Sequence, residues 1–321
     1  MRLFTTIFLI CVGLSSAANA RLVTTQSEGA ICNDGKQATF IVSEAQSEDW
    51  LVYFEGGGVA TSPDSYRNRD SRWKTPQRDG SYGLSIPLVH DFKQKGFNVV
   101  VIPYCSSDLF QGAHTNIVDG KEVFFHGRKI VEDVFAQLNA EFTSSDTLVF
   151  AGHSAGAIAL GFNSDLISRY STSKVIVDSF WLDTESRRER ERWTTGPWVE
   201  INKFVYGNMP AHCTGHWSRC FPQRTKFQSM NISEVFPIWN IGDPYIRGDT
   251  NAVKRSIVSD IEHYGAGFSI DAAALKVEGF ERWGHVVVAN QHYTQEFDGI
   301  TIKMLIENWL SGSGTSHFIK H

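Results

Sequence analysis

Runs of β-branched and aromatic residues alternate with segments of helical periodicity along most of the chain. Six apolar runs predict strands, over residues 37–42, 50–54, 97–103, 147–151, 174–178 and 235–241. Apolar positions at helical spacing predict helices over residues 127–142 and 301–310. Continuous apolar strands that alternate with helices are typical of a mostly parallel sheet covered on both faces. The predicted fold class is therefore α/β, and no linker or internal repeat divides it.

The alternation of strands and helices fails over about residues 181–234. This stretch is rich in tryptophan, phenylalanine and tyrosine, and it holds two of the cysteines. It is too long for an ordinary connection between a helix and a strand. We therefore expect an inserted cap over the site, in which most of the aromatic residues form a small core of their own.

The N-terminus has the pattern of an export signal. Arg2 precedes an apolar run that is too short to span a bilayer, and Ala18-Asn19-Ala20 follows as a cleavage site. We expect residues 1–20 to be a signal peptide and residues 21–321 to form one α/β domain. No later segment approaches the roughly 20 apolar residues of a spanning helix. The predicted location is secreted or periplasmic, without stable membrane insertion.

Net charge and cysteine count narrow the class of protein further. The formal charge of −5 argues mildly against nucleic acid or an anionic membrane surface as the main partner. Four cysteines remain beyond the signal, and an even number in an exported protein predicts two disulfides. Cys213 and Cys220 are close in sequence, which leaves Cys32 to pair with Cys105. A zinc site formed by His212, Cys213, His216 and Cys220 is the alternative, but export and the loose spacing favour the disulfide, and no metal is expected.

The segment 148–157 carries the strongest chemical signal of the chain. A predicted strand leads into Gly152-His153-Ser154-Ala155-Gly156, and a helical pattern follows. This is the G-x-S-x-G nucleophile elbow in its required context. The outer glycines leave room for a tight turn, and the serine lies at a helix N-terminus, where N–H groups favour negative charge. Ser154 is the predicted nucleophile.

An acid is expected after a strand that follows the elbow, because the order along the chain is serine, acid, histidine. Asp243 directly follows the predicted strand 235–241 and fits best. Asp249 is a weaker rival on the following loop, and Asp178 ends a strand that comes one strand too early.

A histidine is expected before the last helix, where it can act as the general base for the serine. His285 lies in Arg282-Trp-Gly-His-Val-Val-Val288 and has this position. His292 and His263 are its rivals. His153 is adjacent to the serine, and neighbouring side chains diverge at an elbow, so it is not the expected base.

Backbone N–H groups are expected to bind the oxyanion of the tetrahedral intermediate. One comes from Ala155, the residue after the nucleophile, and the others come from a loop after an early strand. The turn Glu55-Gly56-Gly57-Gly58 follows such a strand, and we favour Gly57 and Gly58 as donors. This chemistry needs neither a metal nor an organic cofactor.

Several segments together resemble the pectin acetylesterase family. They are residues 32–35, 51–57, 103–108, 125–128 and 152–156, and the Tyr104-Cys-Ser-Ser-Asp108 block is the most specific. The resemblance implies an exported α/β-hydrolase-like esterase with Ser154, Asp243 and His285 as its triad. The chain departs from the family pattern at Gly58, where a tryptophan is usual, and at Ala157, where a second glycine is frequent. We therefore expect a different pocket rim.

The sequence predicts a serine carboxylic-ester hydrolase that removes O-acetyl groups from a polysaccharide such as pectin. The expected partner is thus an acylated carbohydrate. An alternative keeps the chemistry but uses lipid, protein-linked acyl or small aryl esters as substrates. A non-catalytic carbohydrate- or lipid-binding module is less favoured, because Ser154 and plausible triad partners are present.

Overall fold

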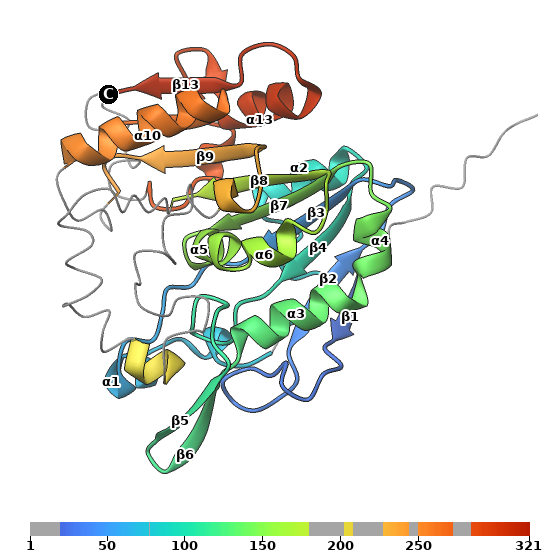
Figure 1. Ribbon diagram of the computed structural model, residues 1–321, viewed down its shortest axis with the longest axis vertical. Coiled ribbons are helices and arrows are strands. Elements are labelled where there is room, and N and C mark those ends of the chain that lie inside the picture. The colour runs from blue at the N-terminus through green and yellow to red at the C-terminus, as the bar shows by residue number, and fades with distance from the viewer. Residues whose placement is uncertain (1–19, 77, 180–201, 208–226, 244–249, 272–283) are drawn as a thin grey trace, which may run out of the picture.

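A computed structural model describes residues 20–76, 78–179, 202–207, 227–243, 250–271 and 284–321. Its centre is a nine-stranded sheet in the order β1-β2-β4-β3-β7-β8-β9-β10-β13 (Figure 1). Its strands are β1 Ala20–Thr24, β2 Thr39–Ser43, β3 Trp50–Phe54, β4 Asn98–Ile102, β7 Leu148–His153, β8 Ser173–Asp178, β9 Val235–Asn240, β10 Gly267–Ile270 and β13 His317–Lys320. Only β2 pairs antiparallel with its neighbours β1 and β4, whereas the described strands from β4 to β13 run parallel. The predicted α/β class with a mostly parallel sheet is confirmed.

Helices cover both faces of the sheet, and each layer encloses one apolar cluster. One face packs against α3 Gly127–Gln137, α4 Asn139–Thr143, α5 Ala155–Phe162, α6 Ser164–Ile167 and α10 Thr250–Tyr264. The other face packs against α2 Pro87–Gln94, the 3-10 helix η5 Gln291–Tyr293 and α13 Ile302–Ser311. Central strands are therefore buried on both sides, which is why they appear in the sequence as unbroken apolar runs.

Short elements lie outside this three-layer core. They are α1 Pro63–Arg67, the 3-10 helix η1 Ser71–Trp73, the π-helix η2 Asn202–Tyr206, the hairpin of β5 His114–Val118 and β6 Lys121–Phe125, and the ribbon of β11 Glu296–Phe297 and β12 Ile300–Thr301. The hairpin extends away from the sheet (Figure 1). At its base Phe125 packs edge-on against Phe204 of η2, with ring centroids 5.2 Å apart.

The predicted elements match the structure within a few residues, with one break and several omissions. The helix expected over residues 127–142 is two helices, because the chain leaves the helical conformation at Leu138 (φ −112°, ψ 16°). The edge strands β1 and β13 and the neighbouring β10 were not predicted, since they are short and half of their residues or more are polar, small or exposed. Among the described residues, no helix is both long and apolar enough to cross a membrane.

The structure contains the disulfide between Cys32 and Cys105, which joins an N-terminal loop to the segment after β4. Cys213 and Cys220 lie outside the described residues, so their pairing stays a prediction. The same holds for the signal peptide and for most of the expected cap, of which only residues 202–207 and 227–234 are described. Ala20, the expected cleavage position, is the first residue of β1.

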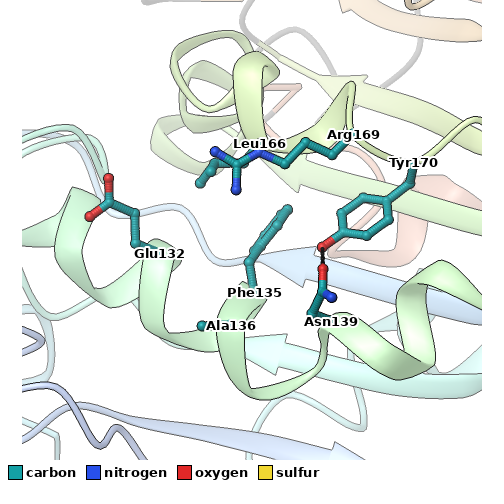
Figure 2. Close-up of a pocket in the computed structure, with 7 residues that line it drawn as sticks. All are labelled: Glu132, Phe135, Ala136, Asn139, Leu166, Arg169 and Tyr170. Atoms are coloured by element: carbon teal, nitrogen blue, oxygen red, sulfur yellow. Dashed lines mark hydrogen bonds between the residues drawn. The ribbon is translucent and has the colours of Figure 1, made fainter.

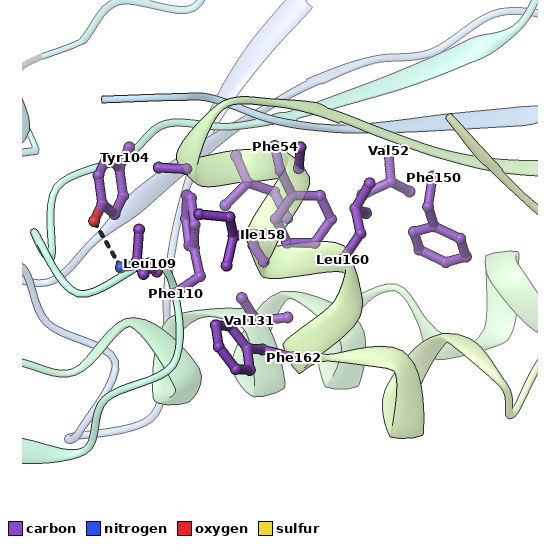
Figure 3. Close-up of a cluster of buried hydrophobic side chains, with 14 of the residues drawn as sticks. Val52, Phe54, Tyr104, Leu109, Phe110, Val131, Phe150, Ile158, Leu160 and Phe162 are labelled. Atoms are coloured by element: carbon purple, nitrogen blue, oxygen red, sulfur yellow. Dashed lines mark hydrogen bonds between the residues drawn. The ribbon is translucent and has the colours of Figure 1, made fainter. Parts of the chain in front are cut away.

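Behind the elbow, α5 is buried along its whole length. Figure 3 shows its side chains Ile158 and Phe162 among aromatic and aliphatic groups from β3, the loop after β4, and α3. In this cluster Phe54 meets Phe110 edge-on at 5.5 Å, and the Tyr104 hydroxyl accepts a hydrogen bond from the backbone N–H of Leu109 at 2.7 Å. The helix that carries the elbow is thus fixed by close packing on both sides.

Candidate active site

The elbow has the strained geometry that its sequence requires. Ser154 has φ 51° and ψ −117°, between the end of β7 and the start of α5. A side chain at Gly156 would place Cβ 2.1 Å from the carbonyl oxygen of Phe54, and one at Gly152 would lie 2.5 Å from the carbonyl oxygen of Gly156. Only glycine fits at these two positions, because the clashing atoms belong to the backbone.

Ser154, His285 and Asp243 form a continuous chain of hydrogen bonds. The Ser154 Oγ lies 2.8 Å from Nε2 of His285, and Nδ1 of His285 lies 2.7 Å from Oδ2 of Asp243. The Asp243 side chain is 3% exposed. Because its carboxylate can only accept, Nδ1 carries the ring proton and Nε2 is left to accept from the serine hydroxyl. This arrangement can deprotonate the serine as it attacks a carbonyl carbon.

The three residues come from separate parts of the chain that meet at the carboxyl edge of the parallel strands. Asp243 lies three residues after β9, and its N–H donates to the carbonyl oxygen of Asn240 at 3.1 Å. His285 lies in the loop before η5. Parallel strands bring their carboxyl ends to one edge of a sheet, so loops distant in sequence assemble a single site there.

The rival residues lie elsewhere or have other contacts. His292 is buried in η5, with Nδ1 2.5 Å from Oε1 of Gln295. His263 is on α10 and lies 3.2 Å from the side-chain nitrogen of Gln228. Asp249 is outside the described residues.

Asp178 has a role that sequence reasoning missed. It ends β8 fully buried, and its Oδ2 accepts hydrogen bonds from the N–H groups of Val287 and Val288 at 2.7 and 2.8 Å. Its backbone carbonyl accepts the N–H of Ser154 at 2.9 Å. Burial raises the pKa of this carboxyl to about 6, against the opposing effect of its hydrogen-bond donors. Asp178 therefore fixes both the elbow and the loop that carries His285.

That loop contains a second strained residue. Val286 has φ 75°, a conformation that β-branched residues rarely adopt. Its N–H donates to Oγ of Ser179 at 2.7 Å, and the Ser179 hydroxyl donates to Oδ1 of Asp178 at 2.6 Å. The end of β8 thus holds the histidine loop through consecutive backbone N–H groups, and these contacts offset the strain.

His153 is connected to the glycine turn rather than to the nucleophile. The N–H of Gly56 donates to its Nε2 at 3.1 Å, and its Nδ1 lies 2.6 Å from the Tyr53 hydroxyl. Burial and the nearby His285 lower the pKa of His153 to about 3, so the ring is neutral. Since Nε2 accepts, the single ring proton is on Nδ1. His153 is therefore a structural support for the turn, in agreement with its exclusion as the base.

The turn after β3 leaves backbone donors available. Gly56 is engaged by His153, whereas the N–H groups of Gly57, Gly58 and Ala155 form no hydrogen bond with another residue in the described part of the chain. The turn is held from behind by buried Glu55, which accepts from the Tyr104 N–H at 2.8 Å. These three N–H groups are the donors that an oxyanion site needs.

A pocket in the described part of the chain lies away from this site. It has a volume of about 450 Å³ and is lined by Glu132, Phe135, Ala136, Asn139, Leu166, Arg169 and Tyr170 (Figure 2). These side chains come from α3, α4, α6 and the segment after α6, and Tyr170 lies three residues before β8 begins. The pocket is thus near the amino ends of the strands, whereas Ser154 follows the carboxyl end of β7. Among the described residues, no group of three or more histidine, cysteine, aspartate or glutamate side chains could hold a metal ion.

Comparison with known proteins gives a consistent assignment over more than half of the chain. The family model "Pectinacetylesterase" matches residues 14–236, which include Ser154, Gly57 and Gly58 but end before Asp243 and His285. The assignment of the acid and the base therefore rests on their order along the chain and on the hydrogen-bond geometry.

Individual relatives share 22 to 30% of their aligned residues with this chain. Palmitoleoyl-protein carboxylesterase notum1 of Xenopus laevis is 28% identical over 67% of this chain and 46% of its own length. Palmitoleoyl-protein carboxylesterase NOTUM of Mus musculus is 30% identical over 65% of this chain and 43% of its own. Pectin acetylesterase 7 of Arabidopsis thaliana is 22% identical over 53% of this chain and 47% of its own. The chain thus matches less than half the length of each of these relatives. The resemblance found in the sequence is confirmed, and the chain belongs to the pectinacetylesterase family.

Proposed function

We propose that this protein is a serine carboxylic-ester hydrolase. The observation that carries the proposal is the unbroken chain of hydrogen bonds from Ser154 Oγ through His285 to Asp243, at 2.8 and 2.7 Å. Ester hydrolysis is also the activity named by the matching family and by the relatives described above.

In the proposed mechanism His285 takes the proton of Ser154 as Oγ attacks the acyl carbonyl carbon. Asp243 keeps the imidazole in the correct tautomer and stabilises the imidazolium that forms. The oxyanion is bound by the N–H groups of Gly57, Gly58 and Ala155. Collapse of the intermediate expels the alcohol with the proton from His285, and water then cleaves the acyl-enzyme by the same steps.

The proposed natural substrate is an O-acetylated polysaccharide such as pectin, and the proposed location is outside the cytoplasm. The family description and the Arabidopsis relative support the first part. The disulfide between Cys32 and Cys105 supports the second, since disulfides persist in oxidising compartments.

A second candidate substrate is a protein-linked fatty acyl ester. It is favoured by the higher identity, 28 to 30%, to relatives named palmitoleoyl-protein carboxylesterases. Both candidates use the same triad and differ only in the acyl length and the alcohol that the site must accept.

The test compares wild type with Ser154→Ala, and Ser168→Ala, directly after α6, serves as a matched control. Acetate release from acetylated pectin and acetylated xylan is measured beside hydrolysis of p-nitrophenyl esters of two to sixteen carbons. We expect Ser154→Ala to lose at least about 10³-fold in kcat on every substrate that wild type cleaves, and Ser168→Ala to match wild type. Unchanged hydrolysis in Ser154→Ala would refute the proposal. Acetate release from a polymer favours the first substrate, and activity confined to long acyl chains favours the second.

A further inference from the structure

Arg69 lies directly behind the glycine turn. It follows α1, and its Nη2 donates to the carbonyl oxygen of Gly57 at 2.8 Å. Its Nε donates to Oγ of Ser107 at 2.8 Å, in the segment after β4. The guanidinium group also lies over the rings of Trp73 and Tyr104, at 5.1 and 5.8 Å from their centroids. Two hydrogen bonds and two rings therefore fix its position and plane.

Arg69 has no carboxylate partner among the residues that the structure describes. No carboxylate oxygen of the described residues lies within salt-bridge distance of Arg69, although the side chain is largely buried. Burial of a charge normally disfavours folding unless hydrogen bonds or an opposite charge compensate it. The neighbouring Arg72 differs, because it is exposed and lies beside Asp70 at 3.5 Å. The two hydrogen bonds and two rings compensate the partial burial of Arg69, and one of these hydrogen bonds ties its charge to the glycine turn.

The contact with Gly57 determines the direction of the next N–H group. The peptide bond between Gly57 and Gly58 is trans, since the described chain has no cis peptide. In a trans peptide the C=O and the following N–H point in opposite directions. When Arg69 holds the carbonyl oxygen of Gly57, the N–H of Gly58 must point away from the guanidinium. A charged donor on the carbonyl also polarises the peptide and strengthens its N–H as a donor.

We propose that Arg69 is a positioning residue that orients and polarises the Gly57–Gly58 peptide so that the Gly58 N–H binds the oxyanion. The inference rests on the proposed ester hydrolysis at Ser154. It adds a cation that acts through one peptide group, without touching the substrate. Its effect is largest in the transition state, where negative charge develops on the substrate oxygen, so loss of Arg69 lowers kcat more than it raises KM.

The experiment measures kcat and KM for p-nitrophenyl acetate in Arg69→Ala, Arg69→Lys and Arg72→Ala. Arg72 is the matched control, because it lies over the same indole, 4.6 Å from its centroid, and forms no hydrogen bond to the described residues of the turn. The kcat is expressed per active site titrated with a phosphonate ester. We expect Arg69→Ala to lose about 10- to 100-fold in kcat with KM within about threefold, less than the loss of a whole oxyanion donor. Arg72→Ala should retain wild-type kcat.

Chemical rescue separates positioning from a structural role. Guanidinium ion at millimolar concentration should restore part of the kcat of Arg69→Ala, whereas urea, which is neutral, should not. Arg69→Lys keeps the charge but not the two-pronged geometry, so its kcat should lie between those of wild type and Arg69→Ala. If Arg69→Ala is recovered unfolded, Arg69→Lys alone decides the question.

Failure of the proposed ester hydrolysis can be distinguished from failure of the proposed role of Arg69. Hydrolysis that is unaffected by Ser154→Ala overturns the proposed function. Hydrolysis that depends on Ser154 but keeps wild-type kcat per active site in the folded Arg69 variants, or a loss that appears equally in Arg72→Ala, overturns only the role of Arg69.

Discussion

Replacing Asp178 by alanine should disable the active site without touching the triad. The carboxylate accepts the N–H groups of Val287 and Val288, which are both fully buried. Each buried N–H left without an acceptor costs about 1–3 kcal/mol, so Asp178→Ala should lower the free energy of unfolding by about 2–6 kcal/mol. The strained Val286 also loses the indirect support that Ser179 gives it through the carboxylate.

The effect on catalysis follows from the position of His285 in the same loop. Relaxation of Val286 moves the imidazole away from Ser154, and a displacement of about 1 Å can reduce the rate by about 10²-fold. We therefore expect kcat per folded molecule to fall by about that factor. Asp178→Asn should lower both the free energy of unfolding and kcat less than Asp178→Ala does, because the amide oxygen can still accept from the two valine N–H groups.

Asp133→Ala is the matched control for this comparison. Asp133 on α3 is also buried and also accepts two backbone N–H groups, those of Gln26 and Ser27 at 3.0 and 2.6 Å, but these belong neither to the elbow nor to the loop that carries His285. Urea unfolding gives the stability of each variant, and ester hydrolysis well below the unfolding midpoint gives kcat. Asp133→Ala should lose stability and keep kcat. Equal retention of kcat by Asp178→Ala would show that the carboxylate of Asp178 contributes to stability only, and the positional reasoning would be wrong.

Three further outcomes are expected. Gly156→Ala should fail to accumulate as folded protein, because its Cβ would lie 2.1 Å from the Phe54 carbonyl oxygen, and soluble Gly156→Ala with wild-type melting would contradict the elbow geometry. Reduction of the disulfide between Cys32 and Cys105, which are 73 residues apart, should lower stability by about 4 kcal/mol, measured as a drop in melting temperature with reductant. The raised pKa of Asp178, about 6 against about 3.9 in the unfolded chain, means that the folded state binds more protons between these values. Stability from this group is present at low pH and is lost as pH rises through 6. The wild-type advantage over Asp178→Asn in free energy of unfolding should therefore shrink by about 2 kcal/mol from pH 4 to pH 7. An advantage that grows with pH would refute the assignment.

The central part of the fold could be predicted from the sequence because its strands are buried on both faces. The strands β3, β4, β7, β8 and β9 appear as unbroken apolar runs for that reason. The edge strands gave no such signal. β13, for example, has a burial pattern of exposed, intermediate, intermediate and exposed residues, so its sequence shows no apolar run. Its place in the sheet depends on pairing with β10, a contact between residues about fifty positions apart.

The candidate site shows the same division between local and long-range information. The elbow could be recognised because a tight turn needs glycine at Gly152 and Gly156 within five residues. Asp243 and His285 could be proposed only from their order along the chain, and the family match ends before both. Nothing local distinguishes Asp178 from Asp243, since each follows a buried strand. The two residues differ in their hydrogen-bond partners. Asp243 binds an imidazole nitrogen, and Asp178 binds two backbone N–H groups.

That difference assigns separate tasks to two chemically identical side chains. The carboxylate of Asp243 accepts from a ring that must gain and lose a proton, whereas the carboxylate of Asp178 accepts from amides that do not titrate. The first contacts the base itself, whereas the second acts on the base mainly through the position of its loop. Arg69 and Asp178 have comparable roles, because each holds backbone groups of one loop beside Ser154. Arg69 holds the glycine turn, and Asp178 holds the loop that carries His285. The nucleophile, by contrast, is fixed by its own strained turn and by the carbonyl of Asp178, so small displacements of either loop change the rate while the serine remains in place.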